Sequence, residues 1–299
     1  MGDSHHDHRP VLLSETLELL APKSGDRILD CTLGLGGHAT SLLEAAGPTG
    51  SLVGLDADQE NLDSAMLNLS AFTDQCTFIH SNFSEISNLD IGSFDIIFAD
   101  LGVSSPHFDD ADRGFSFRKE GPLDMRFDRS SGKSAAEIVG NVSSEDLANI
   151  LFKYGEIRQS RKLADAMKSA NITTTSDLTL VIEEALGFSA KSVLPQVFQA
   201  LRIAVNDELG ALSALLDNAP GLLNTGGRLG IIAFHSLEDR AVKQHFRAIT
   251  APEIDDRTGG VATEAPFVLL GRKAVKPSEQ EIEQNPRARS ARLRAIERR

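Results

Sequence analysis

The sequence predicts an α/β protein in which a parallel sheet is interrupted by a helical insertion. Three observations support this fold class. The first hundred residues alternate strand and helix patterns, as in a parallel α/β sheet. Residues from about 134 to 219 carry helical apolar spacing instead. A further apolar run at 229–234 then resumes the strand pattern. We therefore expect a sheet domain formed by residues 1–130 and 220–299, and an inserted helical domain at 131–219.

The expected elements follow from the apolar runs and the turns between them. Strands are expected at 27–31, 51–56, 77–80, 95–100 and 229–234. One helix should follow the glycine turn and pass through Leu43 and Glu44, and another should span about 59–69. Within the later segment, apolar residues at helical spacing are Phe198, Leu201, Val205, Leu209, Leu212 and Leu216.

Composition restricts the setting and the partners. The formal charge of −13 argues at first against nucleic acid, because a phosphate backbone repels an acidic surface. The charge is uneven, however, since residues 271–299 hold nine Lys or Arg against four Glu. A basic tail on an acidic body is compatible with nucleic acid reached through one face. Cys31 and Cys76 form no cluster, so we expect no structural metal and no disulfide, and a cytoplasmic protein without a membrane segment or signal peptide.

A glycine turn between two expected strands indicates a nucleoside cofactor. The turn is Gly34-Leu35-Gly36-Gly37, and Asp56 follows the second strand 22 positions after Gly34. Glycines let the backbone approach a ligand, the helix start offers free N–H groups, and the acid can accept both ribose hydroxyls. The alternative is a structural turn beside a surface Asp. The pattern does not choose its ligand, because with Ala39 it also fits NAD, and an NAD-linked oxidoreductase stays open on this feature.

Asp100 ends the fourth expected strand and begins the run Asp100-Leu101-Gly102-Val103-Ser104-Ser105-Pro106. In open α/β sheets the carboxyl ends of the strands face the ligand crevice. The lone pair of an exocyclic base amine is delocalised into the ring. A carboxylate that accepts the amine N–H can localise that lone pair and align it with a methyl group. The alternative is an Asp that caps the next turn.

Two segments after this strand interleave arginine with phenylalanine and glycine, at 113–119 and 123–127. Such a composition suits a mobile loop that stacks a base and contacts phosphate, with Arg113 and Arg126 as the cations. An irregular connection whose aromatics pack beneath it is the alternative. His235 follows the fifth strand, where it faces the substrate base or serves as a structural histidine. Ser236 and Asp239 are expected to form a capping box.

The tail from 285 to 299 allows two compatible interpretations. Its arginines, Arg287 and Arg289 among them, form a phosphate-binding strip. Alternatively, residues 291–296 form a closing edge strand, which places Ala291, Leu293 and Ala295 on one face and the arginines on the other.

Several segments together resemble one known family. The chain resembles the bacterial small-subunit rRNA cytosine-N4 methyltransferases of the RsmH (formerly MraW) family, and the resemblance covers nearly the whole chain. The matching segments, in order, are HRPVLLSE, DCTLGLGGHAT, GLDAD, ADLGVSSP, DRGFSF, GPLDMRFD, YGE, FQALRIAVNDEL, GGRLGIIAFHSLEDRAVK and NPRARSARLR.

The resemblance implies a Rossmann-like class I methyltransferase sheet with an inserted all-helical domain. It also implies transfer of a methyl group from S-adenosylmethionine to N4 of a cytidine in the decoding region of 16S rRNA. The implied cofactor contacts are Gly36, Gly37, His38, Asp56, Phe83, Asp100 and His107. Two positions depart from the family: His107 stands where Gln is usual, and Ser192–Gln196 replaces the usual HPATR, so any RNA contact made there is replaced or absent.

We expect Asp100 and His235 to be catalytic. The residues expected to contact the RNA are Ser104, Ser105, Arg113, Arg126, Arg287 and Arg289. The competing hypotheses are the NAD-linked oxidoreductase and a ribosome-assembly factor that keeps the fold without turnover. Retention of Asp56 and Asp100 argues against the second of these.

Overall fold

The computed structural model of the chain describes residues 10–255 and 260–299, so the first two residues of HRPVLLSE lie outside it. The chain forms two compact units, a sheet unit (1–102 with 210–299) and a helical unit (103–209). Both borders lie earlier in the chain than the sequence suggested. The first lies earlier because Phe115, Leu123 and Met125 are buried in the core of the helical unit. The second lies earlier because Leu212 and Leu216 are buried in the core of the sheet unit.

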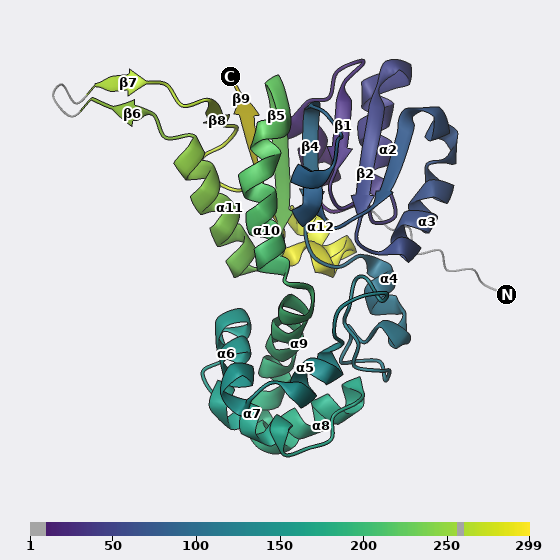
Figure 1. The fold of residues 1–299 in the computed structure, drawn as a ribbon, viewed down its shortest axis with the longest axis vertical. Coiled ribbons are helices and arrows are strands. Elements are labelled where there is room, and N and C mark those ends of the chain that lie inside the picture. Colours follow the sequence, from purple (N-terminus) through teal and green to yellow (C-terminus); the bar gives the residue numbers. More distant parts are fainter. Residues whose placement is uncertain (1–9, 256–259) are drawn as a thin grey trace. The chain divides into compact units, whose positions relative to one another are not determined.

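The sheet unit confirms the α/β prediction (Figure 1). Its seven strands have the order β3-β2-β1-β4-β5-β9-β8. The first five along the chain are parallel and the last two are antiparallel to their neighbours. The strands are β1 (Arg27–Asp30), β2 (Ser51–Asp56), β3 (Cys76–His80), β4 (Phe94–Asp100), β5 (Leu223–Ala233), β8 (Phe267–Leu269) and β9 (Arg292–Arg298). The expected range of β2 is exact, and β5 begins earlier than expected.

Helices cover both faces of this sheet, because successive strand residues point to opposite faces. On one face Leu29 and Ile97 share a buried core with residues of α10 (Glu208–Asn218) and α11 (Ser236–Ile249). On the other face Ile28 and Ile96 are buried with residues of α2 (Gly37–Ala46) and α3 (Gln59–Asn68). The helix α1 (Leu13–Leu20) contributes Leu20 to this second core. The strands are therefore apolar on both faces, which leaves their ends for polar chemistry.

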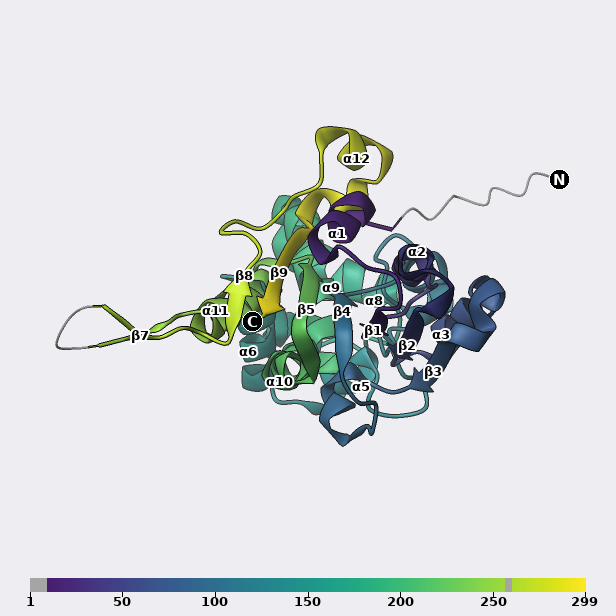
Figure 2. The same ribbon diagram turned by 90° about the horizontal axis from the view of Figure 1, so that it is seen from above.

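The tail forms an interior strand of the sheet. Ala291, Leu293 and Ala295 are buried, as the alternation predicts. The expectation of a closing edge strand is wrong, however, because β9 lies between β5 and β8. Before it come α12 (Glu279–Gln284) and a 3-10 helix (286–290). A separate, exposed pair of antiparallel strands, β6 (Glu253–Ile254) and β7 (Val261–Thr263), projects from the sheet in Figure 2.

The helical unit has its own apolar core, built mainly on α6, α7, α8 and α9. Its helices are α4 (Ser105–Asp109), α5 (Ala135–Asn141), α6 (Ser144–Gly155), α7 (Ser160–Lys168), α8 (Thr175–Leu186) and α9 (Ala190–Asn206). Capping boxes at Ser134 and Thr174 begin α5 and α8. The continuous apolar spacing from Phe198 to Leu216 is interrupted at Asp207, whose φ of 45° ends α9. In the described part of the chain, no helix is long and apolar enough to cross a membrane.

Candidate active site

Three aspartates end three neighbouring parallel strands. Asp30 ends β1, Asp56 ends β2 and Asp100 ends β4, and β1 lies between the other two strands. Asp30 pairs in register with Gly54 and Phe98, so Asp56 and Asp100 lie two residues further along their strands. The sequence prediction named Asp56 and Asp100 but missed Asp30. The same signal, an acid that ends a buried strand before a turn, was present there.

Asp56 fixes the glycine turn that follows β1. Its Oδ2 accepts the N–H of Gly34 at 2.7 Å, and its Oδ1 accepts the N–H of Asp58 at 2.8 Å. Gly34 and Gly36 have positive φ values of 53° and 81°, which residues other than glycine rarely adopt. A Cβ on Gly37 would come within 2.7 Å of Pro10 Cγ. The turn is therefore a close-approach backbone cradle beside a carboxylate, which fits a nucleoside ligand.

The Asp100 carboxyl is held among polar groups but has little hydrogen bonding of its own. The Asp100 N–H donates to the Thr32 hydroxyl at 2.6 Å, which joins the end of β4 to the turn after β1. Its side-chain Oδ2 lies 3.7 Å from His38 Nδ1. Its Oδ1 is buried and has no hydrogen-bond partner among the described residues. An acceptor left in this state invites a donor from a ligand.

Burial and like charge raise the pKa values of these carboxyls. Burial raises the pKa of Asp30 to about 7. The negative charge of Asp56 also raises this pKa, whereas the hydrogen bond from the Thr32 N–H lowers it. Burial raises the pKa of Asp100 well above its usual range, and the negative charges of Asp30 and Glu238 add to the effect. Asp30 therefore exchanges its proton near neutral pH, and a positive charge beside Asp30 and Asp100 would favour their ionised forms.

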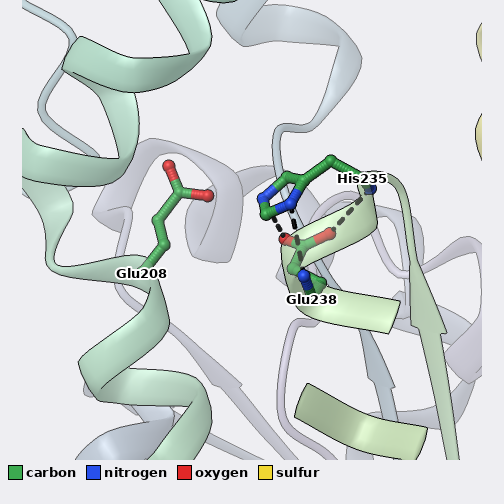
Figure 3. A group of neighbouring side chains, drawn as sticks. All are labelled: Glu208, His235 and Glu238. Atoms are coloured by element: carbon green, nitrogen blue, oxygen red, sulfur yellow. Dashed lines mark hydrogen bonds and ion pairs between the residues drawn. The ribbon is translucent and has the colours of Figure 1, made fainter. Parts of the chain in front are cut away.

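His235 begins α11 as its N-cap residue (Figure 3). Its Nδ1 accepts the Glu238 N–H at 3.3 Å, and the Glu238 carboxylate accepts the His235 N–H at 3.2 Å. The capping box expected at Ser236 and Asp239 is therefore wrong by one residue, and Asp239 binds Arg294 instead, with Nε to Oδ1 at 2.8 Å. These contacts give His235 a structural task, and its catalytic role stays a prediction.

The other implied cofactor residues lie on separate elements. In the sheet unit, Phe83 begins a 3-10 helix (83–88) after β3 and packs against the core. In the helical unit, His107 is buried with its ring 4.9 Å from that of Phe115 and 5.3 Å from that of Phe127. Its Nδ1 accepts the N–H of Ser104, which caps α4, at 3.1 Å. A cofactor contact by His107 stays a prediction.

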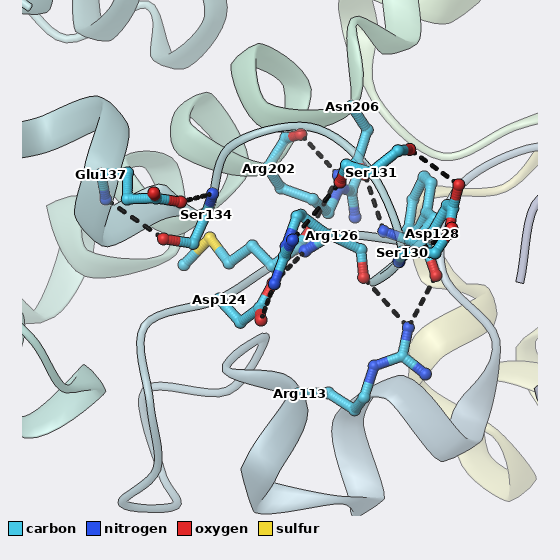
Figure 4. Close-up of polar contacts among 12 residues, drawn as sticks. Arg113, Asp124, Arg126, Asp128, Ser130, Ser131, Ser134, Glu137, Arg202 and Asn206 are labelled. Atoms are coloured by element: carbon cyan, nitrogen blue, oxygen red, sulfur yellow. Dashed lines mark hydrogen bonds and ion pairs between the residues drawn. The ribbon is translucent and has the colours of Figure 1, made fainter.

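The expected RNA-contacting loop is a packed ionic cluster (Figure 4). Arg113 is 3% exposed and donates from one terminal nitrogen to the carbonyls of Arg126 and Phe127, both at 3.0 Å. Arg126 binds Asp124 through two bonds of 2.8 and 2.9 Å. Asn206 accepts the Phe127 N–H at 2.8 Å. The Arg113 guanidinium thus satisfies two half-buried carbonyls, and its contact with RNA stays a prediction.

Of the remaining residues predicted to contact RNA, two are exposed arginines and one has a side chain that the structure does not describe. Arg287 and Arg289 are exposed on the 3-10 helix before β9. Ser105 is the first residue of α4, and its side chain lies outside the described part of the structure.

Comparison with known proteins places this site in a family. The model of the MraW methylase family matches residues 5–299. The chain belongs to the MraW methylase family. A relative from Anaeromyxobacter sp. (strain K), named ribosomal RNA small subunit methyltransferase H, is 44% identical over 97% of each chain. A relative of the same name from Syntrophotalea carbinolica is also 44% identical, over 97% of this chain and 98% of its own.

A solved structure of a putative methyltransferase from Streptococcus mutans in complex with SAH covers 97% of this chain and 99% of its own, with 12% identity and a TM-score of 0.43. Membership of the methylase family indicates S-adenosylmethionine as the cofactor, as the sequence predicted. The glycine turn alone was also compatible with NAD, but membership of the methylase family favours S-adenosylmethionine.

Proposed function

We propose that this MraW-family chain methylates small-subunit ribosomal RNA, and that its acceptor is N4 of a cytidine in the decoding region of 16S rRNA. The names of relatives at 44% identity support the RNA class. The observation that carries the proposal is the Asp100 carboxyl, which ends β4 with a buried oxygen that has no hydrogen-bond partner among the described residues. That oxygen suits the N–H of an exocyclic amine.

The chain's residues divide the work of binding and orientation. The turn at Gly34–Gly37, fixed by Asp56, receives the cofactor, and a carboxylate at the end of β2 suits its ribose hydroxyls. S-adenosylmethionine, when bound, supplies an electrophilic methyl group. Gly36, Gly37, His38, Phe83 and His107 are the further cofactor contacts that the family resemblance implies.

Asp100 orients the acceptor. By accepting one amine N–H, its carboxylate draws the nitrogen lone pair out of the ring and aligns it with the methyl carbon. Methylation leaves one proton too many on that nitrogen, and Asp100 is the group in contact with it. A carboxyl whose pKa is raised by burial is a better proton acceptor than an ordinary aspartate.

Contacts with the rest of the RNA fall to exposed cations and polar groups. Arg287 and Arg289 are exposed and can reach phosphate. Arg126 is held by Asp124 and Arg113 by carbonyls, so we assign both to the loop's own structure rather than to phosphate. Ser104 and Ser105 stay candidates through their place next to Asp100 in the sequence.

The decisive experiment is methyl transfer to small subunits that lack the modification. Labelled S-adenosylmethionine is incubated with such subunits, the RNA is digested, and the labelled nucleoside is identified. We expect N4-methylcytidine as the product, with incorporation almost abolished by Asp100→Asn. Label in a different nucleoside, or no label with wild-type protein that binds the cofactor, would contradict the proposal.

A further inference from the structure

His38 is fixed from two sides so that one ring nitrogen points to Asp100. The residue lies on α2 and is 7% exposed. Its Nε2 lies 2.9 Å from the carbonyl oxygen of Val11. Its ring packs on Phe98, with centroids 4.6 Å apart. Its Nδ1 lies 3.7 Å from Asp100 Oδ2.

These contacts determine the tautomer of the ring. A carbonyl oxygen only accepts hydrogen bonds, so Nε2 must carry the hydrogen in the bond to Val11. In the neutral imidazole the other nitrogen, Nδ1, then holds the lone pair. A basic nitrogen therefore faces the carboxyl that meets the acceptor amine in the proposed function.

We propose that His38 is a positioning residue that takes up the proton passed to Asp100 during methyl transfer, an inference that rests on the proposed function. The amine lone pair forms the new bond to the methyl carbon, and the electrons of the broken carbon–sulfur bond stay on sulfur. One N–H proton leaves the amine for the Asp100 carboxylate, and a proton passes from Asp100 Oδ2 to His38 Nδ1. The ring becomes an imidazolium that still donates from Nε2 to Val11, and the proton later returns to solvent.

The distance and the surrounding charges are consistent with this role. At 3.7 Å the two atoms are beyond hydrogen-bond length, and catalytic hydrogen bonds are often long until the substrate is in place. Asp30 on β1 and Glu238 on α11 face the Asp100 carboxyl with negative charge, and Asp56 on β2 acts on Asp30. These charges favour a proton on the pair, so Asp100 and His38 titrate as one unit.

The first test needs no methyl transfer, so its outcome is independent of the proposed function. Long-range ¹H–¹⁵N spectra of the histidine rings in the full chain, with His38 assigned by its loss in His38→Gln, report its tautomer and titration. We expect the Nε2–H tautomer at high pH. Asp100→Asn should change the titration of His38, because it removes the proton-binding group that is coupled to the ring. An Nδ1–H tautomer, or a titration unmoved by Asp100→Asn, would overturn the inference.

The second test follows single-turnover methyl transfer against pH at saturating cofactor and subunits. His38→Gln keeps an amide near the position of Nε2 for Val11 but removes the basic nitrogen that faces Asp100. We expect the rate to fall about tenfold at its plateau. The acidic inflection should move to lower pH, because the proton has one binding position fewer.

A purely structural role for His38 would lower the rate equally at every pH, and an unmoved inflection would therefore overturn the inference. His80→Gln is the matched control, because His80 also bonds a carbonyl, that of Ala57 at 3.0 Å, but is exposed. Its rate profile should match that of the wild type. Failure of the wild type itself to transfer methyl would instead contradict the proposed function.

Discussion

Two polar clusters of this chain differ in whether their charged groups are paired with opposite charges. In the helical unit, the cluster around Arg113, Asp124 and Arg126 pairs its charges with one another or with carbonyls. Burial acts to raise the pKa of Asp124, but its bonds to Arg126 bring the net pKa below the usual value. In the sheet unit, the buried Asp30 and the half-buried Asp100 lie beside other carboxyls, and their pKa values are raised.

The difference separates a structural cluster from a functional one. Ion pairs that satisfy one another hold a loop in one conformation and leave little capacity for a ligand. Buried acids without matching cations lower the stability of the fold, and such arrangements are characteristic of functional sites.

The largest effect is expected on stability when Asp30 is neutralised. Its pKa is about 7 in the folded chain against an ordinary 3.8, so the folded state holds the proton more tightly. The stability contributed by that proton is complete below pH 3.8 and is lost as pH rises through 7. Asp30→Asn removes this loss, so its advantage in urea unfolding over wild type should grow by on the order of 4 kcal/mol between pH 4 and 8.

The exposed Asp63 on α3 provides the matched control for this exchange. In Asp63→Asn the difference from wild type should not grow with pH. If the difference in unfolding free energy between Asp30→Asn and wild type is also independent of pH, the pKa of Asp30 is not raised in the folded chain. The contrast between the two clusters would then fail.

The next effect concerns the rate of methyl transfer. Asp100→Asn keeps the shape of the side chain but weakens its acceptance of the amine proton. We expect the single-turnover rate at saturating cofactor and subunits to fall by on the order of a hundredfold, comparable to the loss of one positioned polar group. A rate equal to that of the wild type would remove Asp100 from its assigned role.

The structural cluster should respond in stability instead. Arg113→Met leaves two half-buried carbonyls without their charged donor, which should destabilise the chain by about 2 kcal/mol in urea unfolding. Affinity for S-adenosylhomocysteine, measured by calorimetry on the folded variant, should stay unchanged. Arg118→Met, at an exposed position of the same segment, should change neither quantity. A loss of cofactor affinity without a loss of stability would make Arg113 a ligand-binding residue.

The smallest effect concerns the exposed tail. If Arg287 and Arg289 each contact a phosphate, replacing both by Ala should reduce the slope of log affinity against log salt by a little under two units for small subunits. Cofactor affinity should not change. Arg247→Ala, at an exposed position of α11, is the control for a loss of charge elsewhere. An unchanged slope in the double variant would leave this part of the tail without an RNA contact.

The sheet could be predicted because its strands are short apolar runs separated by turns, and β2 matched its expected range exactly. The edge strand could not, because β8 has three residues, Phe267–Leu269, and shows no period. The wrong residues were chosen for the α11 capping box because Ser236 is a common cap, whereas His235 takes the role here. Sequence also cannot tell a buried Arg113 from an exposed one, since burial depends on partners distant in the chain.

We expect Asp30 and Asp100 to hold protons until a cationic ligand arrives. Calorimetry of S-adenosylmethionine binding at pH 7, in buffers of different ionisation enthalpy, measures the protons exchanged. A cation near Asp30 and Asp100 lowers their pKa values, so binding should release protons, and part of this release should disappear in Asp30→Asn. Binding without proton release, or with a release that Asp30→Asn leaves intact, would contradict the account.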